Sequence, residues 1–239
     1  MSGDVVHLRA PAGSIFTRAF EELGAVPAAS VRWALIGGLA VSVRLSLAHR
    51  ATHDVDAMST HPDDLVELLV RAGGVKSGGL VRLHDVPIDP VPAPGEGKGR
   101  LPAARSWAFD GATAVDVLVS DAANERRATA RPLVATTAGL VLLKLESSVH
   151  AFDRSAAKRA TDVYDVLRLF AADVEAFHAE AAHAPRPLRA DAAQCARERL
   201  LRNPAATLRH FSDVQRKEFT VADLAFYGDA LIRALSDGR

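Results

Sequence analysis

The sequence predicts an α+β fold in which a mixed sheet flanked by helices, over residues 1–120, is followed by a helical half over residues 121–239. In the first part, short runs of branched and aromatic residues alternate with amphipathic helical patterns, which is typical of helices packed on a sheet. After about residue 121 the chain is rich in Ala, Leu, Arg and Asp, and it shows few strand signals. We therefore expect two domains, 1–120 and 121–239.

Local patterns predict the order of elements in the first half. The stretch 61–74 predicts a helix, because Pro62 lies in its first turn, acidic residues follow at the positive end of the helix dipole, and a glycine pair ends it. The first dozen residues are expected to be loosely ordered, and the Pro- and Gly-rich stretch 90–104 to form a long loop. Further helices are expected at 15–26 and 39–50, and strands at 31–36, 52–59, 79–85, 105–111 and 113–121.

The composition disfavours several classes of protein. The chain has 29 Lys and Arg against 29 Asp and Glu, which argues against a strongly basic protein that coats nucleic acid but leaves room for a local basic face. Cys195 is the single cysteine, so no disulfide forms within the chain, and the cytoplasm is the natural compartment. With no His near it in the sequence, Cys195 is not expected to be a nucleophile. The N-terminus does not resemble a signal peptide, and no apolar run is long enough to span a membrane.

A glycine pair and an acidic pair stand out in the first half. Gly37 and Gly38 follow an apolar run and precede an expected helix, where backbone N–H groups favour an anion such as a phosphate. Ser42, one turn further on, could add a hydroxyl. Asp54 and Asp56 lie two positions apart in the next expected strand, so their side chains point the same way and suit a hard cation such as Mg²⁺.

A third carboxylate is expected near this acidic pair. Asp116 lies in the alternating stretch 113–121, and aspartate within a strand is disfavoured unless it has a specific role. We expect Asp116 either to bind metal or to accept a proton from a hydroxyl. The dinucleotide fingerprint G-x-G-x-x-G is absent, so a dehydrogenase of the Rossmann type fits poorly.

The stretch GGLAVSVRLSLAHRATHDVDAM, residues 37–58, resembles the signature of the DNA polymerase β-like nucleotidyltransferases. Its second part is similar to the AbiEii-type nucleotidyltransferases of abortive-infection and toxin–antitoxin systems, whose pattern R-x-T-x-D-h-D is matched by Arg50, Thr52, Asp54 and Asp56. His53 stands where a Lys is expected. The resemblance covers residues 31–170, and it implies a polymerase β-like core that transfers NMP from an NTP to an acceptor hydroxyl with Mg²⁺ or Mn²⁺. It further implies an RNA acceptor such as a tRNA 3′ end and a cognate antitoxin as partner.

The same resemblance assigns residues of the helical half to the nucleotide site. Lys144 would contact phosphates, Asp162 would act near the nucleotide or orient Lys144, and Arg154 and Asp165 would complete the nucleotide-binding set. The residues alone leave two interpretations. Lys144 lies in an apolar run and either snorkels to the surface or reaches a pocket. Lys158, Asp162 and Asp165 share a stripe that a solvated, salt-bridged helix face would also explain.

Several alternatives stay open at this point. A small-molecule nucleotidyltransferase of the antibiotic type would use the same core, and a non-catalytic NTP-binding or antitoxin-like module would keep it with a degenerate site. The doublet His53-Asp54 raises a phosphohydrolase of the HD type, although that fold needs its ligands on helices. Between residues 186 and 217, eight Lys and Arg outnumber three acidic residues, which fits a solvated helical surface or an RNA-facing one.

Overall fold

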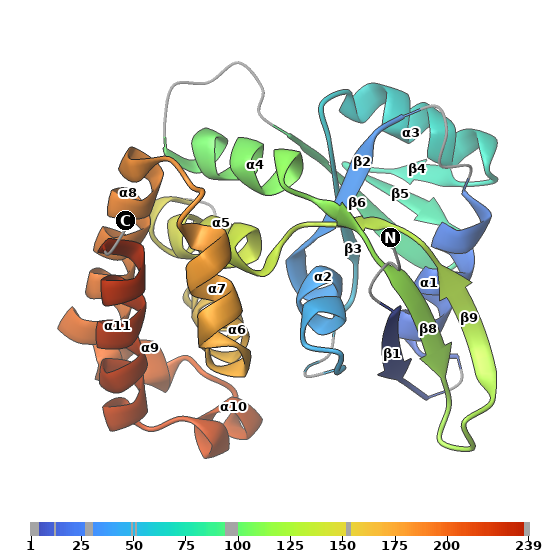
Figure 1. The fold of residues 1–239 in the computed structure, drawn as a ribbon. Coiled ribbons are helices and arrows are strands. Elements are labelled where there is room, and N and C mark those ends of the chain that lie inside the picture. The colour runs from blue at the N-terminus through green and yellow to red at the C-terminus, as the bar shows by residue number, and fades with distance from the viewer. Residues whose placement is uncertain are drawn as a thin grey trace. The chain divides into compact units, whose positions relative to one another are not determined.

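The computed structural model describes residues 5–11, 13–26, 31–48, 50, 52–93, 100–151 and 154–236. The chain divides into two compact units, Met1–Glu96 with Phe109–Thr136 and Gly97–Ala108 with Thr137–Arg239. The described strands all lie in the first unit, and the second unit is helical (Figure 1). The expected class, a mixed α/β part followed by a helical half, is therefore confirmed. Strands continue beyond residue 120, so residues 121–136 belong with the first unit.

The strands of the first unit form two sheets. The larger sheet has the order β4-β5-β6-β3-β2-β10-β7, and the smaller one has the order β1-β8-β9. The larger sheet is mixed, since β3 runs antiparallel to β2 and parallel to β6. The strands are β1 Val5–Arg9, β2 Trp33–Ile36, β3 Val55–Ser59, β4 Val75–Ser77, β5 Leu80–Leu83, β6 Val86–Pro92, β7 Thr113–Ala114, β8 Asp116–Ser120, β9 Arg126–Ala130 and β10 Leu133–Val134.

The expected helices of the first unit form, but the one expected at 39–50 begins at Gly37 and ends at Arg44. They are α1 Ile15–Ala25, α2 Gly37–Arg44 and α3 Pro62–Arg71. Ser14 caps α1, because its side chain accepts a hydrogen bond from the backbone N–H of Thr17. The apolar face of α3 is buried against strands β3 to β6, while α1 packs on β8 and β9.

Two expectations for the middle of the chain are wrong. Residues 105–111 were expected as a strand but lie mainly in the helix α4, Arg100–Asp110, where Ala104 and Ala108 are buried one turn apart and Pro102 stands in the first turn. Residues 90–92 were expected in a loop but end β6, a strand inside the sheet. Prolines in β6 hide it, since proline cannot donate to a ladder and is rare in central strands. Residues 94–99 of that stretch lie outside the described residues.

The N-terminal segment is also more ordered than expected. Val5–Arg9 forms β1, which pairs in parallel with β8 through its whole length. The strand is short and alternates exposed and buried positions only weakly, so its pattern gave little signal.

The second unit is built on two long helices, α5 Thr137–His150 and α6 Ala156–Ala172, which pack on each other. Aromatic side chains fill its core, with Phe170 and Phe177 edge to face at 5.2 Å between ring centroids. Burial and a hydrogen bond with Glu218 raise the pKa of Tyr164 to about 12. The remaining helices are α7 Val174–Ala181, α8 Arg186–Ala196, the π-helix η1 Arg197–Arg202, α9 Pro204–Arg209, α10 Asp213–Glu218 and α11 Val221–Ser236.

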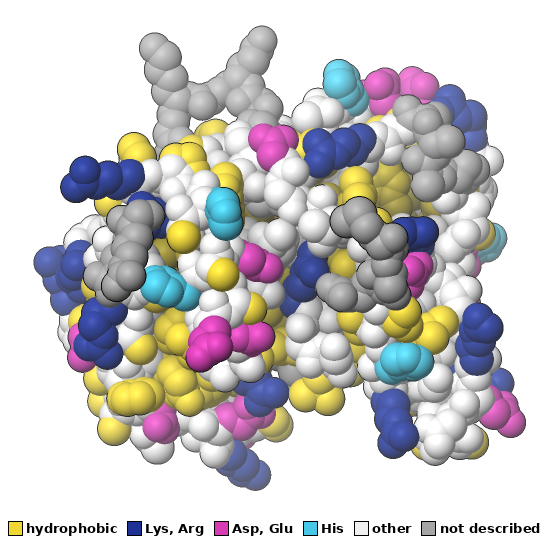
Figure 2. Space-filling view, viewed as in Figure 1, with side chains coloured by type: hydrophobic (Ala, Val, Ile, Leu, Met, Phe, Trp, Pro, Cys, Tyr) yellow, Lys and Arg dark blue, Asp and Glu magenta, His cyan; other side chains and the backbone are white. Residues whose placement is uncertain are grey.

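The surface matches the balanced composition. On the face that Figure 2 shows, cationic and acidic side chains are interspersed, in keeping with a formal net charge of zero. Among the described residues, no helix is both long and apolar enough to cross a membrane.

Candidate functional site

The turn between β2 and α2 brings backbone and carboxylate unusually close. Gly37 has φ +69°, and a Cβ atom at this position would overlap Oδ2 of Asp56. Only glycine meets both demands, because other residues rarely adopt this φ and all carry a Cβ. Ile36 pairs with Asp56 across β2 and β3, which places the Asp56 carboxylate at this turn.

Gly38, the second glycine of this turn, also lies close to other side chains. A Cβ here would lie 2.8 Å from Nη2 of Arg50 and 3.0 Å from Oγ1 of Thr52. Thr52 is buried and donates from Oγ1 to the carbonyl oxygen of Asp54 at 3.2 Å. Three of the four matched positions of the R-x-T-x-D-h-D pattern, Arg50, Thr52 and Asp56, therefore lie at the glycine pair.

The helix α2 begins at Gly37 and has no side chain capping its N-terminus. Uncapped N–H groups and the helix dipole at such an end favour an anion. Arg44 anchors the other end of α2, donating from Nε to the carbonyl oxygen of Ala135 at 2.8 Å and from Nη2 to that of Val134 at 2.6 Å. Ser42 is buried and donates from Oγ to the carbonyl oxygen of Gly38 at 3.2 Å, so in this structure its hydroxyl serves the helix backbone.

Two acidic residues, Asp56 and Asp89, lie on neighbouring strands of the larger sheet. Asp56 is half-buried on β3, and Asp54 stands in the bend directly before this strand. In the parallel pairing of β3 with β6, Asp56 lies opposite Asp89. Residues opposite each other present their side chains to the same face of a sheet, on strands about 4.8 Å apart. Sequence reasoning missed Asp89 because the prolines of β6 concealed its strand.

Asp116, expected as the third carboxylate, lies in the other sheet of the first unit. It begins β8, in the three-stranded sheet, where Oδ1 lies 3.5 Å from Nε of Arg131. The preceding strand β7 is three places from β3 in the larger sheet, or roughly 14 Å at the usual strand spacing. The alternation predicted correctly that Asp116 lies on a strand, but a local pattern cannot say which strands pair.

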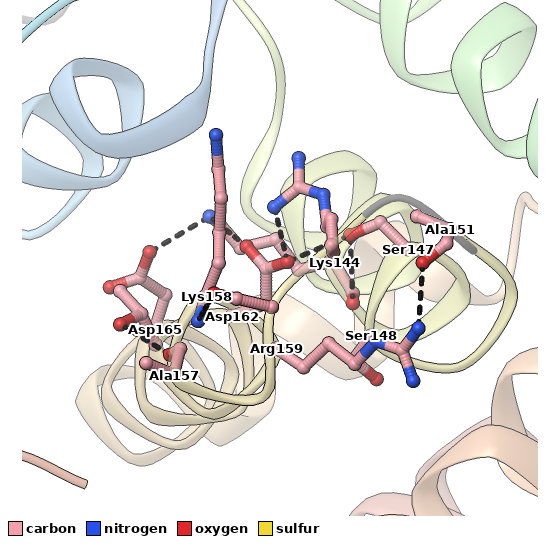
Figure 3. A network of polar contacts seen from close by, with 12 residues as sticks. Lys144, Ser147, Ser148, Ala151, Ala157, Lys158, Arg159, Asp162 and Asp165 are labelled. Carbon is pink, nitrogen blue, oxygen red and sulfur yellow. Dashed lines mark hydrogen bonds and ion pairs between the residues drawn. The ribbon is translucent and has the colours of Figure 1, made fainter. Parts of the chain in front are cut away.

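The predicted residues of the second unit form a buried ionic cluster (Figure 3). Nζ of Lys144 on α5 lies 3.1 Å from Oδ1 of Asp162 and 2.8 Å from Oδ2 of Asp165, both on α6. Each of the three side chains is at most 6% exposed. The solvated helix face is therefore ruled out for both aspartates, and Lys144 is held inside the unit rather than snorkelling to the surface.

Asp162 is the centre of this cluster. Its Oδ2 accepts hydrogen bonds from Nη1 of Arg154 at 2.6 Å and from Oγ of Ser147 at 3.0 Å. Lys158, the third residue of the predicted stripe, is exposed instead. The structure thus unites Lys144, Arg154, Asp162 and Asp165, and it adds Ser147, which the sequence gave no reason to choose.

Cys195 lies next to a histidine and a glutamate that are far from it in the sequence. Its Sγ lies 3.6 Å from Nε2 of His150 and 3.7 Å from Oε1 of Glu146, and the last two residues are one turn apart on α5. Within the described part of the chain, these three residues are the one group of His, Cys, Asp and Glu whose ligand atoms all lie within 4.8 Å of one another. Thiolate, imidazole and carboxylate together suit zinc rather than magnesium.

The chain matches no protein-family model and no curated protein. Among solved structures it is similar to an antigenic nucleotidyltransferase-like protein from Paracoccidioides brasiliensis, at 16% identity and a TM-score of 0.49, over 84% of this chain and 96% of that one. It is also similar to the antibiotic-resistance factor ANT(2'')-Ia, at 14% identity and a TM-score of 0.39, over 70% of this chain and 88% of that one. At these sequence identities and TM-scores the two similarities define no substrate, so a function has to be argued from the residues of the site.

Proposed function

We propose that the protein is a nucleotidyltransferase, which moves NMP from an NTP to an acceptor hydroxyl. The observation that carries the proposal is the position of Asp56, which lies against Gly37 at the start of α2 and opposite Asp89 on β6. A turn whose backbone N–H groups favour phosphate therefore lies next to carboxylates that favour a metal ion. An NTP bound to a divalent cation carries both the phosphates and the metal ion that such a site would bind.

The acidic residues fit a hard divalent cation. Magnesium takes oxygen ligands and is usually held by one or two carboxylates, with substrate phosphates and water completing its shell. Asp56 and Asp89, with Asp54 two positions before Asp56 in the sequence, would hold Mg²⁺ or Mn²⁺ at this face. Bound there, the ion would neutralise phosphate charge and favour the departure of pyrophosphate.

The protein's own groups have distinct parts in this scheme. The N–H groups at Gly37 and Gly38 and the guanidinium of Arg50 bind the triphosphate. The acceptor oxygen attacks the α-phosphorus, the bond to pyrophosphate breaks, and the hydroxyl proton passes to a carboxylate oxygen, which we assign to Asp89. Positioning and charge stabilisation supply most of the catalysis. That Lys144, Arg154, Asp162 and Asp165 complete the nucleotide site stays a prediction from the sequence.

We assign RNA, such as a tRNA 3′ end, as the acceptor. Support comes from the AbiEii-like pattern, since Arg50 and Thr52 meet Gly38 while Asp56 meets Gly37. Three of the four matched positions therefore lie at one turn. The toxin role and a cognate antitoxin are part of this proposal and rest on the same pattern.

The test is transfer of label from each α-³²P-labelled NTP to total cellular RNA with Mg²⁺. We expect the wild type to label RNA, Asp56→Asn and Asp89→Asn to lose the label, and the matched control Asp116→Asn to keep it. Loss in Asp116→Asn with retention in Asp89→Asn would return the third carboxylate to Asp116. NTP binding without labelled RNA would favour a small-molecule acceptor, and absence of NTP binding would favour a non-catalytic module.

A further inference from the structure

A pocket lined by several arginines lies wholly within the second unit. It has a volume of about 310 Å³, at the lower end of the range for small-molecule sites, and is formed by α6, η1, α9 and the residue Arg154 before α6. Its polar lining consists of Arg154, Arg159, Arg199, Asn203, Thr207 and His210. Three arginines therefore line one small volume.

These cations are poorly neutralised by the described part of the chain. Arg154 pairs with the carboxylate of Asp162, but Nη2 of Arg159 donates to the carbonyl oxygen of Ala151 at 3.0 Å, and Nη2 of Arg199 donates to that of Ser148. The Nε atoms of Arg159 and Arg199 are buried and have no hydrogen-bond partner. A buried donor without a partner is costly, so the cost of holding these two arginines is met by the rest of the unit.

Two further observations place Arg199 in a special environment. Burial, followed by the charge of Arg159, lowers the pKa of Arg199, so the two cations lie within electrostatic reach. Arg199 also belongs to the π-helix η1, and π-helices are rare and occur frequently at functional sites.

We propose that this pocket binds a phosphate group of a nucleotide-sized ligand or of a polynucleotide end. Guanidinium groups bind phosphate oxygens through paired N–H donors, and three arginines, Arg154, Arg159 and Arg199, line this pocket. Asn203 and His210 are exposed at the pocket and can contact the rest of the ligand. The site is separate from the glycine pair and does not depend on the nucleotidyl transfer proposed above.

The pocket is also connected to the ionic cluster. Arg154 lines it and donates to Asp162, which in turn contacts Lys144. A bound phosphate would compete with Asp162 for the same guanidinium group. Binding of phosphate in the pocket would therefore change the contacts between Asp162 and Lys144.

The experiment is titration calorimetry of the full chain at constant ionic strength. The probes are inorganic phosphate, AMP and a short RNA with either a 5′-phosphate or a 5′-hydroxyl. The variants are Arg159→Gln and Arg199→Gln, with Arg202→Gln as the matched control, because Arg202 is exposed on the same π-helix. Asp56→Asn separates this site from the proposed catalytic one.

We expect binding to weaken at least about tenfold in Arg159→Gln and Arg199→Gln, and to be unchanged in Arg202→Gln and Asp56→Asn. Arg159→Lys keeps the charge with fewer donors and should be intermediate, which preserves the test if Arg199→Gln does not fold. Binding of AMP would identify a free nucleotide as the source, and binding of 5′-phosphorylated RNA alone would identify a polynucleotide end. No phosphate binding by the wild type, or equal binding by all variants, would overturn the proposal.

Discussion

The two units each gather charged residues, but they hold them in different ways. In the first unit Asp56 is half-buried and is positioned by backbone, through its pairing with Ile36 and its close approach to Gly37. In the second unit Lys144 is positioned by charge, through its contacts with Asp162 and Asp165 in a buried environment. The carboxylate of Asp56 is half-buried at a turn, whereas Lys144 and its two carboxylates are almost fully buried.

This difference separates the two sets of residues by the effect of substitution. Removing one partner from a buried ionic cluster leaves an uncompensated charge inside the protein, which is strongly destabilising. Removing a half-exposed carboxylate that binds a ligand leaves the fold largely intact. Loss of activity alone is therefore strong evidence for a role of Asp56 in catalysis and weak evidence for a role of Lys144.

The largest effect on stability is expected for Lys144→Met. Two buried carboxylates would lose their shared cation, and breaking a buried pair typically costs about 3–5 kcal/mol. Denaturant unfolding should show this loss in the midpoint with little change in slope. Asp56→Asn should change the free energy of unfolding by less than about 1 kcal/mol.

The matched control for this prediction is Lys158→Met. Lys158 is also a lysine and lies on α6 one turn before Asp162, but it is exposed, so its loss should lie within about 0.5 kcal/mol of the wild type. Equal small losses in both lysine variants would show that the cluster does not hold the second unit together. The distinction drawn between the two regions would then fail.

The same contrast explains how far the sequence could be interpreted. Helices α1 and α3 and the strands β2 and β3 follow from local spacing, and so do Gly37, Gly38 and the acidic pair. Asp89 could not be found in this way, because the prolines of β6 made this strand hard to predict. The proposed role of Asp89 also depends on the pairing of β6 with β3, which local spacing does not predict. Asp116 was chosen on a correct local pattern whose strand joins another sheet.

Long-range contacts limited the prediction of the second unit as well. The order of Lys144, Arg154, Asp162 and Asp165 matched a family pattern, and they do meet, but their burial was not visible in a stripe that also contains the exposed Lys158. The partners of Cys195 lie on α5, far away in the sequence. The Arg199 pocket depends on a π-helix, for which the sequence offers no signal.

A smaller effect on stability, with a large one on activity, is expected for Gly37→Ala. The left-handed backbone would cost about 1–2 kcal/mol, and the new Cβ would push the Asp56 carboxylate out of place. Because displacement of a catalytic group by about 1 Å can cost a hundredfold in rate, we expect transfer to fall at least about a hundredfold. Steady-state transfer rates and unfolding curves measured on one preparation would check both parts.

Gly78→Ala is the matched control for Gly37→Ala. Gly78 also has a positive φ, +62°, but a Cβ there would meet no atom within 4 Å. It should therefore show a similar backbone cost and full activity. If Gly78→Ala and Gly37→Ala lost activity to the same extent, backbone strain rather than the overlap with Asp56 would be the cause.

The smallest effect on stability is expected for a substitution of Asp121, whose carboxylate is held both by backbone N–H groups and by a charged side chain. In the turn from β8 to β9, Oδ1 of Asp121 accepts from the backbone N–H groups of Ala123 at 2.9 Å and Glu125 at 3.1 Å, while Oδ2 accepts from Nε of Arg127 at 2.7 Å. The hydrogen bond from Arg127 is the main cause that holds the pKa of Asp121 below its ordinary value of 3.8.

The sign of the resulting pH dependence follows from linkage. Since folding lowers the pKa of Asp121, the ionised form stabilises the folded state above the unfolded pKa of about 3.9, and this contribution is lost as the pH falls through the lower folded value. Asp121→Asn should therefore be less stable than the wild type by a constant amount from about pH 5 to pH 7, and the gap should close below about pH 4. Thermal unfolding of both proteins across this range measures the gap. A gap that persisted unchanged into strong acid would mean that the backbone hydrogen bonds of the turn, rather than the charge on Asp121, carry the stabilisation.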